Sequence, residues 1–395
     1  MSRLTIKIKL NPTEDISLAI DSTLAAYQAS YNRVIEYQYP NILNRINGVE
    51  LHHATYANEK EYGLPTALIC SARVRATETL RSVRTKLKER IKVKGKASFK
   101  QPLAKKPIPI RYNNTCMIVQ LTEGWVSFAT MSGRKKLSFS LPKYYENRTT
   151  LDVKSTELWK DKHGKYFLSV TVESEDPDFV FNSNVVGIDL GIKKPAVTSL
   201  NKFLGRGYWN TVGKRYFEVR RSLQAKGTKS ARRRLRHISG KENRFRKDCD
   251  HVLSRRIVDS VDSGSIIVLE DLTAIRNKKY GRDFNRKLHT WSFSRLSSFI
   301  SYKALMAGCK VELVNPKYTS QECSQCHHVS RKNRKTQSKF KCRKCNFELN
   351  ADLNAARNIA SRYYSKSINL GTSLVNGVQS ITPNVVRTLA ASPAL

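Results

Sequence analysis

The sequence has 395 residues, with 71 Lys and Arg against 32 Asp and Glu, and so a formal net charge of +39. A compact protein with this charge repels itself unless polyanions lie on its surface, so we expect nucleic acid as the partner. An acidic membrane surface is the alternative, but no apolar run approaches the roughly 20 residues of a spanning helix. The N-terminus lacks the apolar core of a secretion signal, so we expect an intracellular protein with no membrane partner.

The first hundred residues predict one strand and two helices. Residues 4–10 alternate apolar and polar side chains, which predicts a strand with a basic outer face. A helix should begin near Thr13, and a second should cover 68–91, where apolar residues recur every three or four positions. The opposite face of this second helix is basic, which suits contact with phosphates. Its basic residues are Arg73, Arg75, Arg81, Arg84, Lys86, Lys88 and Arg90.

From about residue 110 to 174, short β runs alternate with turn-like segments. They predict a small barrel or sandwich that the strand at 4–10 could join, with the helices as an insertion. The segment 185–200 then reads as a buried strand, a turn and a second strand. A buried strand follows at 265–272, a helix at about 291–306 and a strand at 310–314. From Tyr364 we expect a loose tail.

Residues 214–256 form a basic helical stretch with sixteen Lys and Arg against four acids. We expect RNA or an RNA–DNA duplex to bind it; a solvated helix is the alternative. The arginines that we single out are Arg232, Arg233, Arg236 and Arg244.

Four of the eight cysteines form two Cys-x-x-Cys pairs, which is the spacing of a zinc ribbon. The pairs are Cys323 with Cys326 and Cys342 with Cys345. Four thiolates close a tetrahedron around one Zn²⁺, so the metal should be structural. His327 and His328 could replace a ligand, but the cysteines already complete the shell. Between the pairs lies a basic loop that suits phosphate contact (Arg331, Lys332, Arg334, Lys335, Lys339 and Lys341).

Three acids stand where an acid is unexpected. Asp189 lies in an apolar strand, Glu270 ends the apolar run SIIVL, and Asp352 opens an Ala-rich helix. Each alone fits a turn or a helix cap. Together they form the set that a nuclease with two Mg²⁺ ions needs, because Mg²⁺ prefers carboxylate oxygens and phosphates.

The motifs GIDLGIKK, VLEDL, the four-cysteine ribbon and NADLNAARNIA, in this order, resemble TnpB. TnpB proteins are transposon-encoded RNA-guided DNA endonucleases related to the compact type V CRISPR effectors. The motifs cover about 185–360, and the N-terminal half agrees by layout only. Matched motif by motif, Asp189, Glu270 and Asp352 correspond to the three catalytic acids of the family, and the four cysteines to its zinc ligands. Asp271 should point away from the site.

The resemblance implies an α/β multidomain protein. A RuvC-like nuclease domain of RNase H fold would take 181–320 and 349–363, with a zinc ribbon at 321–348. A wedge-like β-barrel would take 1–10 and 97–180 and carry a helical recognition insertion at 11–96, and a flexible tail would take 364–395. The expected activity is Mg²⁺-dependent cleavage of double-stranded target DNA, directed by a structured guide RNA and a short target-adjacent motif. We expect a monomer in the prokaryotic cytoplasm that acts at the nucleoid.

Two other functions remain open from the sequence. A guided repressor would bind DNA without cutting it, although the intact acids argue against this. A transposase could use the same acids on an RNase H fold and would need no large bound RNA.

Overall fold

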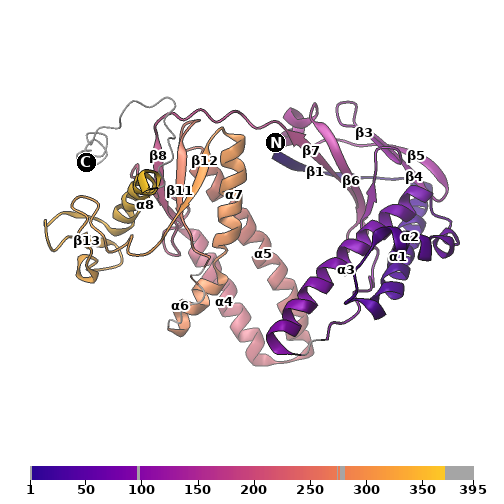
Figure 1. Cartoon of the computed structure of the whole chain (residues 1–395), viewed down its shortest axis with the longest axis horizontal. Helices are drawn as coiled ribbons and strands as arrows, with labels where there is room; N and C mark the ends of the chain where they lie inside the picture. The colour runs from indigo at the N-terminus through magenta and orange to yellow at the C-terminus, as the bar shows by residue number, and fades with distance from the viewer. Residues whose placement is uncertain (1, 96–97, 274, 276–280, 370–395) are drawn as a thin grey trace. The chain divides into compact units, whose positions relative to one another are not determined.

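The computed structural model describes residues 2–95, 98–273, 275 and 281–369 (Figure 1). The chain divides into two compact units, Met1–Glu175 and Asp176–Leu395. None of the described helices is long and apolar enough to span a membrane.

The first unit contains two antiparallel sheets. The larger has the strand order β1-β7-β6-β2, and β1 pairs with β7 along its whole length. Leu4, Ile6, Ile8 and Leu10 alternate into the buried face of β1, as their period of two predicts. The strands of the larger sheet are β1 (Ser2–Leu10), β2 (Ile110–Tyr112), β6 (Asp152–Lys160) and β7 (Tyr166–Ser174). Those of the smaller are β3 (Met117–Gln120), β4 (Trp125–Thr130) and β5 (Gly133–Ser138).

The helices of this unit lie in the sequence between β1 and β2, two strands of one sheet. They are α1 (Glu14–Gln38), α2 (Gly48–Lys60) and α3 (Thr66–Lys94), and the short 3-10 helix η1 (Tyr39–Asn41) directly follows α1. A second 3-10 helix, η2 (Lys143–Arg148), lies between β5 and β6. The apolar stripe of α3 is buried against its neighbours, since Ala72, Ala76 and Leu80 are fully inaccessible. The long helices at 14–38 and 66–94 match the predicted ones, whereas α2 was not predicted.

The second unit is built on a five-stranded mixed sheet of order β10-β9-β8-β11-β12. Strands β8 (Val185–Asp189), β11 (Ile266–Glu270) and β12 (Lys310–Val314) are parallel, and β12 forms one edge of the sheet. Strands β9 (Ala196–Thr198) and β10 (Phe203–Leu204) continue the sheet on the other side of β8 and pair antiparallel. Both β8 and β11 are almost wholly buried. Helices on both faces account for this, because parallel strands covered on two sides read as continuous apolar runs.

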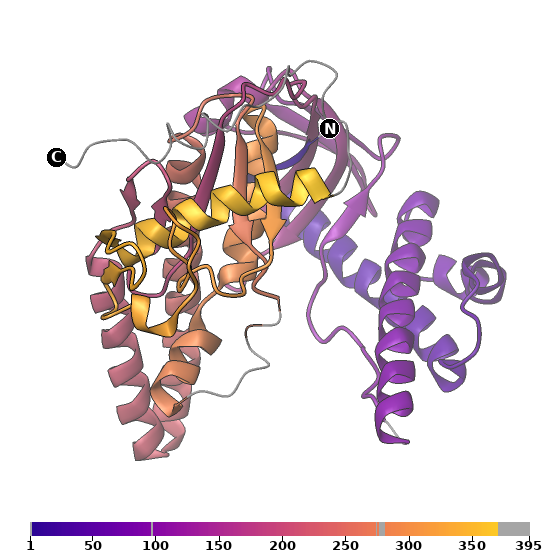
Figure 2. The same cartoon turned by 60° about the vertical axis from the view of Figure 1, so that its left-hand side comes forward.

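Each face of this sheet has its own helix layer. Ile188, Ile267 and Leu269 pack against residues of α5 (Lys229–Val258) and α7 (Phe293–Met306). Val185 and Val268 face the other way and pack against α8 (Ala351–Asn369). Figure 2 shows α8 crossing the strands on that side.

Gly187 permits the close approach of α8 to β8. A Cβ atom at this position would lie 2.2 Å from the carbonyl oxygen of Ala356 and 2.5 Å from the amide nitrogen of Ala360. Any side chain would therefore push the helix away from the strand, so a glycine is required by packing rather than by backbone conformation.

The remaining elements of the second unit are α4 (Tyr208–Lys226), α6 (Arg282–Thr290), η4 (Arg331–Asn333), β13 (Lys339–Lys341) and β14 (Glu348–Asn350). The basic stretch predicted as helical is divided between α4 and α5, which are separated by Gly227 in the left-handed conformation. One boundary was wrong: α8 continues through 364–369, where we expected a flexible tail. Residues 370–395 of that predicted tail lie outside the described residues.

Candidate metal centre

Strand topology brings two of the predicted acids together. Asp189 is the last residue of β8 and Glu270 is the last residue of β11. The strands are parallel neighbours in which Leu269 is paired with Ile188, so the two acids follow at adjacent positions. Ligand sites in open α/β sheets lie at this carboxyl edge of parallel strands.

The third acid comes from the helix that covers this sheet. Asp352 lies in the first turn of α8, where a negative charge also favours the helix N-terminus. Its side chain is 13% exposed, and it makes ion pairs with Arg334 at 3.2 Å and with Lys194 at 3.8 Å. Asp352 therefore lies in a polar, largely buried setting beside two cations.

The electrostatics of Asp189 show that the three acids interact. Burial, together with the charges of Glu270 and Asp352, raises its pKa to about 8, while the charge of Arg334 opposes the rise. A buried carboxylate whose pKa is raised by two other carboxylates lacks sufficient positive charge around it. The site would gain stability from a bound cation.

Glu270 has a similar environment with one specific partner. Burial raises its pKa, whereas a hydrogen bond from Thr319 and the charge of Arg362 lower it. The Thr319 hydroxyl donates to Glu270 Oε1 at 2.5 Å. Asp271, the next residue, is exposed and accepts hydrogen bonds from the amide and hydroxyl of Thr273, so it points away from the other acids, as the sequence predicts.

The donor set suits Mg²⁺, because carboxylate oxygens are the ligands that this hard cation prefers. Within the described residues, the three acids do not form a group whose ligand atoms all lie within 4.8 Å of one another. A site with two ions about 4 Å apart does not require that, since it spreads its ligands over a wider space.

The four predicted zinc ligands are brought together by the ribbon. Their sulfur atoms all lie within 4.8 Å of one another. The Sγ–Sγ distances are 3.7 Å for Cys323 and Cys345, and 3.5 Å for Cys326 and Cys342. A tetrahedral Zn²⁺ with bonds of about 2.3 Å puts its sulfurs about 3.8 Å apart, so the cluster fits zinc.

Both cysteine knuckles end in the same backbone conformation. His327 and Asn346, each directly after the second cysteine of a pair, have φ angles of 58° and 57°. The ring of His327 is turned toward Glu322, with Nδ1 at 3.1 Å from Oε1. In this arrangement His327 serves as a partner of Glu322 rather than as a zinc ligand.

The structure also places residues at the site that the sequence did not reveal. Arg334 was assigned to phosphate contact with the rest of its loop, but it contacts Asp352 instead. Lys194 and Thr319 were not predicted. For Lys194 the sequence offered one signal, its place in the GIDLGIKK motif. For Arg334 and Thr319 it offered none, because their partners, Asp352 and Glu270, lie in other segments of the chain.

The basic residues predicted to bind nucleic acid fall into two groups. Arg73, Arg81 and Arg84 of α3 donate to the backbone carbonyls of Gly48, Ile46 and Leu43. Those three arginines thus have contacts inside their own unit, whereas Lys88 is exposed. The four predicted arginines of α5 are all exposed: Arg232, Arg233, Arg236 and Arg244.

Two family models match the chain. Residues 168–279 match the OrfB_IS605 family, described as "Probable transposase", and residues 293–359 match the Cas12f1-like TNB domain. The first region contains two of the acids and the second contains the ribbon and the third acid.

Curated relatives include a CRISPR-associated endodeoxyribonuclease Cas12f1 from Sulfoacidibacillus thermotolerans, which is 35% identical over 219 residues. That alignment covers 51% of this chain and 51% of the relative. A TnpB-like protein from Methanocaldococcus jannaschii is 36% identical over 142 residues, which is 35% of this chain and 49% of the relative. The chain thus spans about half the length of the curated relatives it matches.

Solved structures share the fold. The Cas12f1 chain in a complex with sgRNA and target DNA matches with a TM-score of 0.59 and 18% identity, over 88% of this chain and 83% of that chain. CasPhi-2 (Cas12j) bound to crRNA matches with a TM-score of 0.51 and 10% identity, over 91% of this chain and 98% of that chain. The chain is an α/β multidomain protein similar to the compact Cas12 effectors, and the resemblance to TnpB that its motifs indicate is confirmed.

Proposed function

We propose that this chain is an RNA-guided DNA endonuclease that cuts its target by two-metal hydrolysis. The observation that carries the proposal is the meeting of Asp189, Glu270 and Asp352, where the last two raise the pKa of the first. Three acids from β8, β11 and α8 would hold the metal ions. The endonuclease names of the relatives and the RNA and DNA in the matching complex support the same activity.

The proposed domain organisation follows the layout of the family. The RuvC-like nuclease of RNase H fold would take 181–320 and 349–363, and the ribbon at 321–348 would be its insertion. The wedge-like barrel would take 1–10 and 97–180, with the recognition insertion at 11–96. The pairing of β1 with β7 on either side of the inserted helices supports the second assignment.

In the proposed mechanism, the three carboxylates gather the positive charge that the phosphodiester needs. Two Mg²⁺ ions, when bound, would activate water and stabilise the leaving oxygen. Burial raises the pKa values of Asp189 and Glu270 and so disfavours their ionised forms unless a cation is bound beside them. Lys194 and Arg334 supply fixed positive charge beside Asp352 that a phosphate can also use. Zinc would have a structural role, because four cysteines leave no open position.

The proposed partners are a structured guide RNA and a double-stranded DNA target, bound by a monomer acting at the prokaryotic nucleoid. The exposed arginines of α5 support the RNA partner, because phosphate contacts dominate affinity for nucleic acid.

A transposase is the second candidate, since residues 168–279 match a family described as "Probable transposase". It would join or cut DNA ends without a guide. A guided repressor is a third, and it would bind the same RNA and target without cutting.

The experiment that separates these functions starts with the nucleic acid that copurifies with the full chain. Sequencing should find one abundant structured RNA, and the complex should cut a plasmid library next to one short motif when Mg²⁺ is present. DNA ends without such RNA would indicate the transposase. Target binding without cleavage under Mg²⁺ or Mn²⁺ would indicate the repressor.

A further inference from the structure

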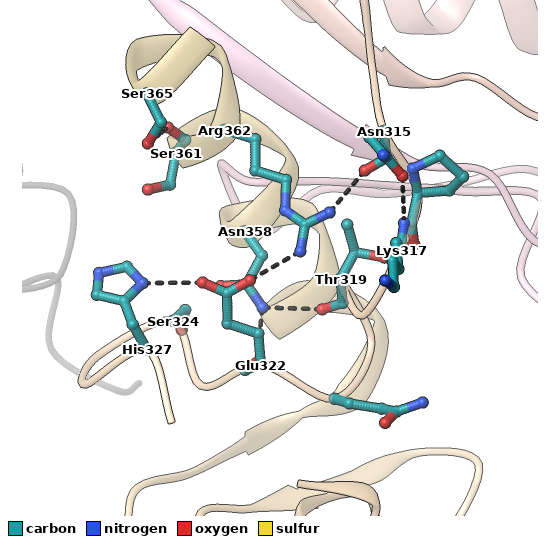
Figure 3. Close-up of polar contacts among 12 residues, drawn as sticks. Asn315, Lys317, Thr319, Glu322, Ser324, His327, Asn358, Ser361, Arg362 and Ser365 are labelled. Atoms are coloured by element: carbon teal, nitrogen blue, oxygen red, sulfur yellow. Dashed lines mark hydrogen bonds and ion pairs between the residues drawn. The ribbon is translucent and has the colours of Figure 1, made fainter. Parts of the chain in front are cut away.

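The segment between β12 and the ribbon is fastened to α8 by buried polar side chains. Asn358, which is 1% exposed, donates from Nδ2 to the carbonyl oxygen of Thr319 at 2.8 Å and to that of Glu322 at 2.7 Å. Asn354, one turn earlier, also donates to the Glu322 carbonyl, at 2.8 Å. Figure 3 shows Asn358 and Arg362 pointing from α8 toward Thr319 and Glu322.

Charged contacts reinforce this attachment. Arg362 donates to Glu322 Oε2 at 2.9 Å and to the carbonyl of Asn315 at 2.6 Å (Figure 3). The chain is therefore held to α8 on both sides of Thr319, and the next residue after Glu322 is the zinc ligand Cys323. Little freedom is left to the backbone of Thr319.

The hydroxyl of Thr319 is directed by this fixed backbone. Thr319 is 4% exposed, and its single proton has two acceptors, Glu270 Oε1 at 2.5 Å and the Pro316 carbonyl at 3.2 Å. The carboxylate is nearer and charged, so it takes the proton in the stronger bond. A donor on a rigid backbone selects one orientation of the Glu270 carboxylate.

We propose that Thr319 is a positioning residue that orients Glu270 for the metal ions, and that α8 sets its place through Asn358. This inference rests on the metal site proposed above. One helix would then locate all three acids: it carries Asp352, it packs on β8 at Gly187, two residues before Asp189, and it fixes the donor that orients Glu270. Partners of this kind, which hold a ligand without touching the metal, typically change metal affinity by about 10–100-fold when removed.

The test compares Thr319→Val, which keeps the shape but removes the hydroxyl, with Thr319→Ser, which keeps the hydroxyl. Mn²⁺ titration of the zinc-bound full chain by calorimetry should show a Kd about tenfold or more higher for the valine variant and a value near wild type for serine. Thr273→Val is the matched control, because Thr273 makes the same bond to Asp271, outside the site. It should leave Mn²⁺ binding unchanged.

A second measurement does not depend on metal. Crystal structures of the metal-free proteins should show the Glu270 carboxylate in a new orientation in Thr319→Val and in the wild-type orientation in Thr319→Ser. A lower melting temperature with unchanged Glu270 and unchanged Mn²⁺ affinity would overturn the proposal and leave Thr319 a structural role in its turn. The proposed metal site is wrong if wild type binds no Mn²⁺, or if Asp189→Ala binds Mn²⁺ as well as wild type does. In that case the orientation of the Glu270 carboxylate in the metal-free crystal structures still shows whether Thr319 positions it.

Discussion

Arg334 of the ribbon and Asp352 of α8 form an ion pair with a nitrogen–oxygen distance of 3.2 Å. The same guanidinium also donates to the Gln337 carbonyl at 3.0 Å, which fixes it within the ribbon loop. Arg334 lowers the pKa of Asp189 as well, so its charge acts on two of the three acids. The ribbon thus contributes a cation to the candidate metal centre, in addition to its own four-cysteine cluster.

Replacing Arg334 with Gln should lower the stability of the metal-free protein. The variant loses a hydrogen bond between charged groups and leaves the carboxylates to repel one another, which costs about 1–3 kcal/mol. Urea unfolding at neutral pH measures this difference. Arg331→Gln, an exposed residue of the same loop, is the control and should change the free energy by less than about 0.5 kcal/mol. Equal losses in both variants would show that the ion pair has no special role.

Without metal, Asp189→Asn should be more stable than wild type, by a difference that grows as pH rises. The pKa of Asp189 is about 8 in the fold and 3.8 without it, so between these values the unfolded chain releases a proton that the folded chain keeps. Wild-type stability therefore falls from about pH 4 to about pH 8, and the amide removes this loss. Melting temperatures from pH 5 to 9 should show a difference that grows with pH and then levels off.

Asp271→Asn is the control for that experiment, with the opposite sign. Hydrogen bonds from Thr273 lower the pKa of Asp271, so its ionised form favours the fold and Asp271→Asn should be less stable than wild type above the acid range.

Mg²⁺ should raise the melting temperature of wild type and of Asp271→Asn, but not that of Asp189→Asn. A pH-independent difference between wild type and Asp189→Asn would contradict the buried setting of Asp189.

Alanine at Asp189, Glu270 or Asp352 should abolish cleavage while RNA and target binding stay near wild type. Each change removes a negative group from the proposed site for two divalent ions, whereas the proposed nucleic-acid contacts are made by Lys and Arg elsewhere in the chain. Double variants should be no worse than single ones, because the acids act as a unit. Cleavage is measured with Mg²⁺ and binding with Ca²⁺; Asp271→Ala should cut normally. Near wild-type cutting by Asp189→Ala would show that the metal site is assigned wrongly.

The ribbon should contain one zinc ion per chain, detectable by elemental analysis of the purified protein. Cys342→Ser should lower the yield of folded protein and its melting temperature, because a structural zinc site contributes folding energy directly. Cys309→Ser is a suitable comparison, since this buried cysteine lies outside the cluster. A stable, active protein without zinc would rule out the structural role.

Arginines of α5 and α3 should respond differently to substitution. Arg232→Gln and Arg236→Gln should weaken RNA binding and flatten its salt dependence, by about 0.7–0.9 in the log–log slope for each phosphate that the variant no longer neutralises. Arg73→Gln should mainly lower stability, because Arg73 donates to the Gly48 carbonyl at 3.0 Å. Affinities measured between low and moderate salt, with melting curves, separate the two effects. An unchanged slope in the α5 variants would place RNA on another surface.

The candidate metal ligands that belong to short sequence motifs could be predicted from the sequence. Cys323 and Cys342 each begin a Cys-x-x-Cys pair, and Asp189 interrupts an apolar strand, so neighbours in the chain reveal them. The long helices α1 and α3 could be predicted for the same reason, because their apolar period is visible over many turns.

Contacts between distant segments could not be predicted in this way. Thr319 reaches Glu270 from 49 positions away, and Arg334 reaches Asp352 across the ribbon. The contacts of the α3 arginines could not be predicted for the same reason. The basic stripe is visible in the sequence, but the backbone carbonyls to which Arg73 and Arg81 donate belong to another segment. A helical period likewise gave no sign that α8 would extend beyond Tyr364.

The position of α8 also determines when the proposed site can form during synthesis. Asp189 and Glu270 leave the ribosome well before Asp352, and at about 5–20 residues per second the first acid precedes the third by on the order of ten seconds. During that interval one face of the sheet is uncovered and the donor that α8 holds near Glu270 is unanchored. On the proposed function, a nascent chain would therefore bind RNA through α5 before it is able to cut DNA.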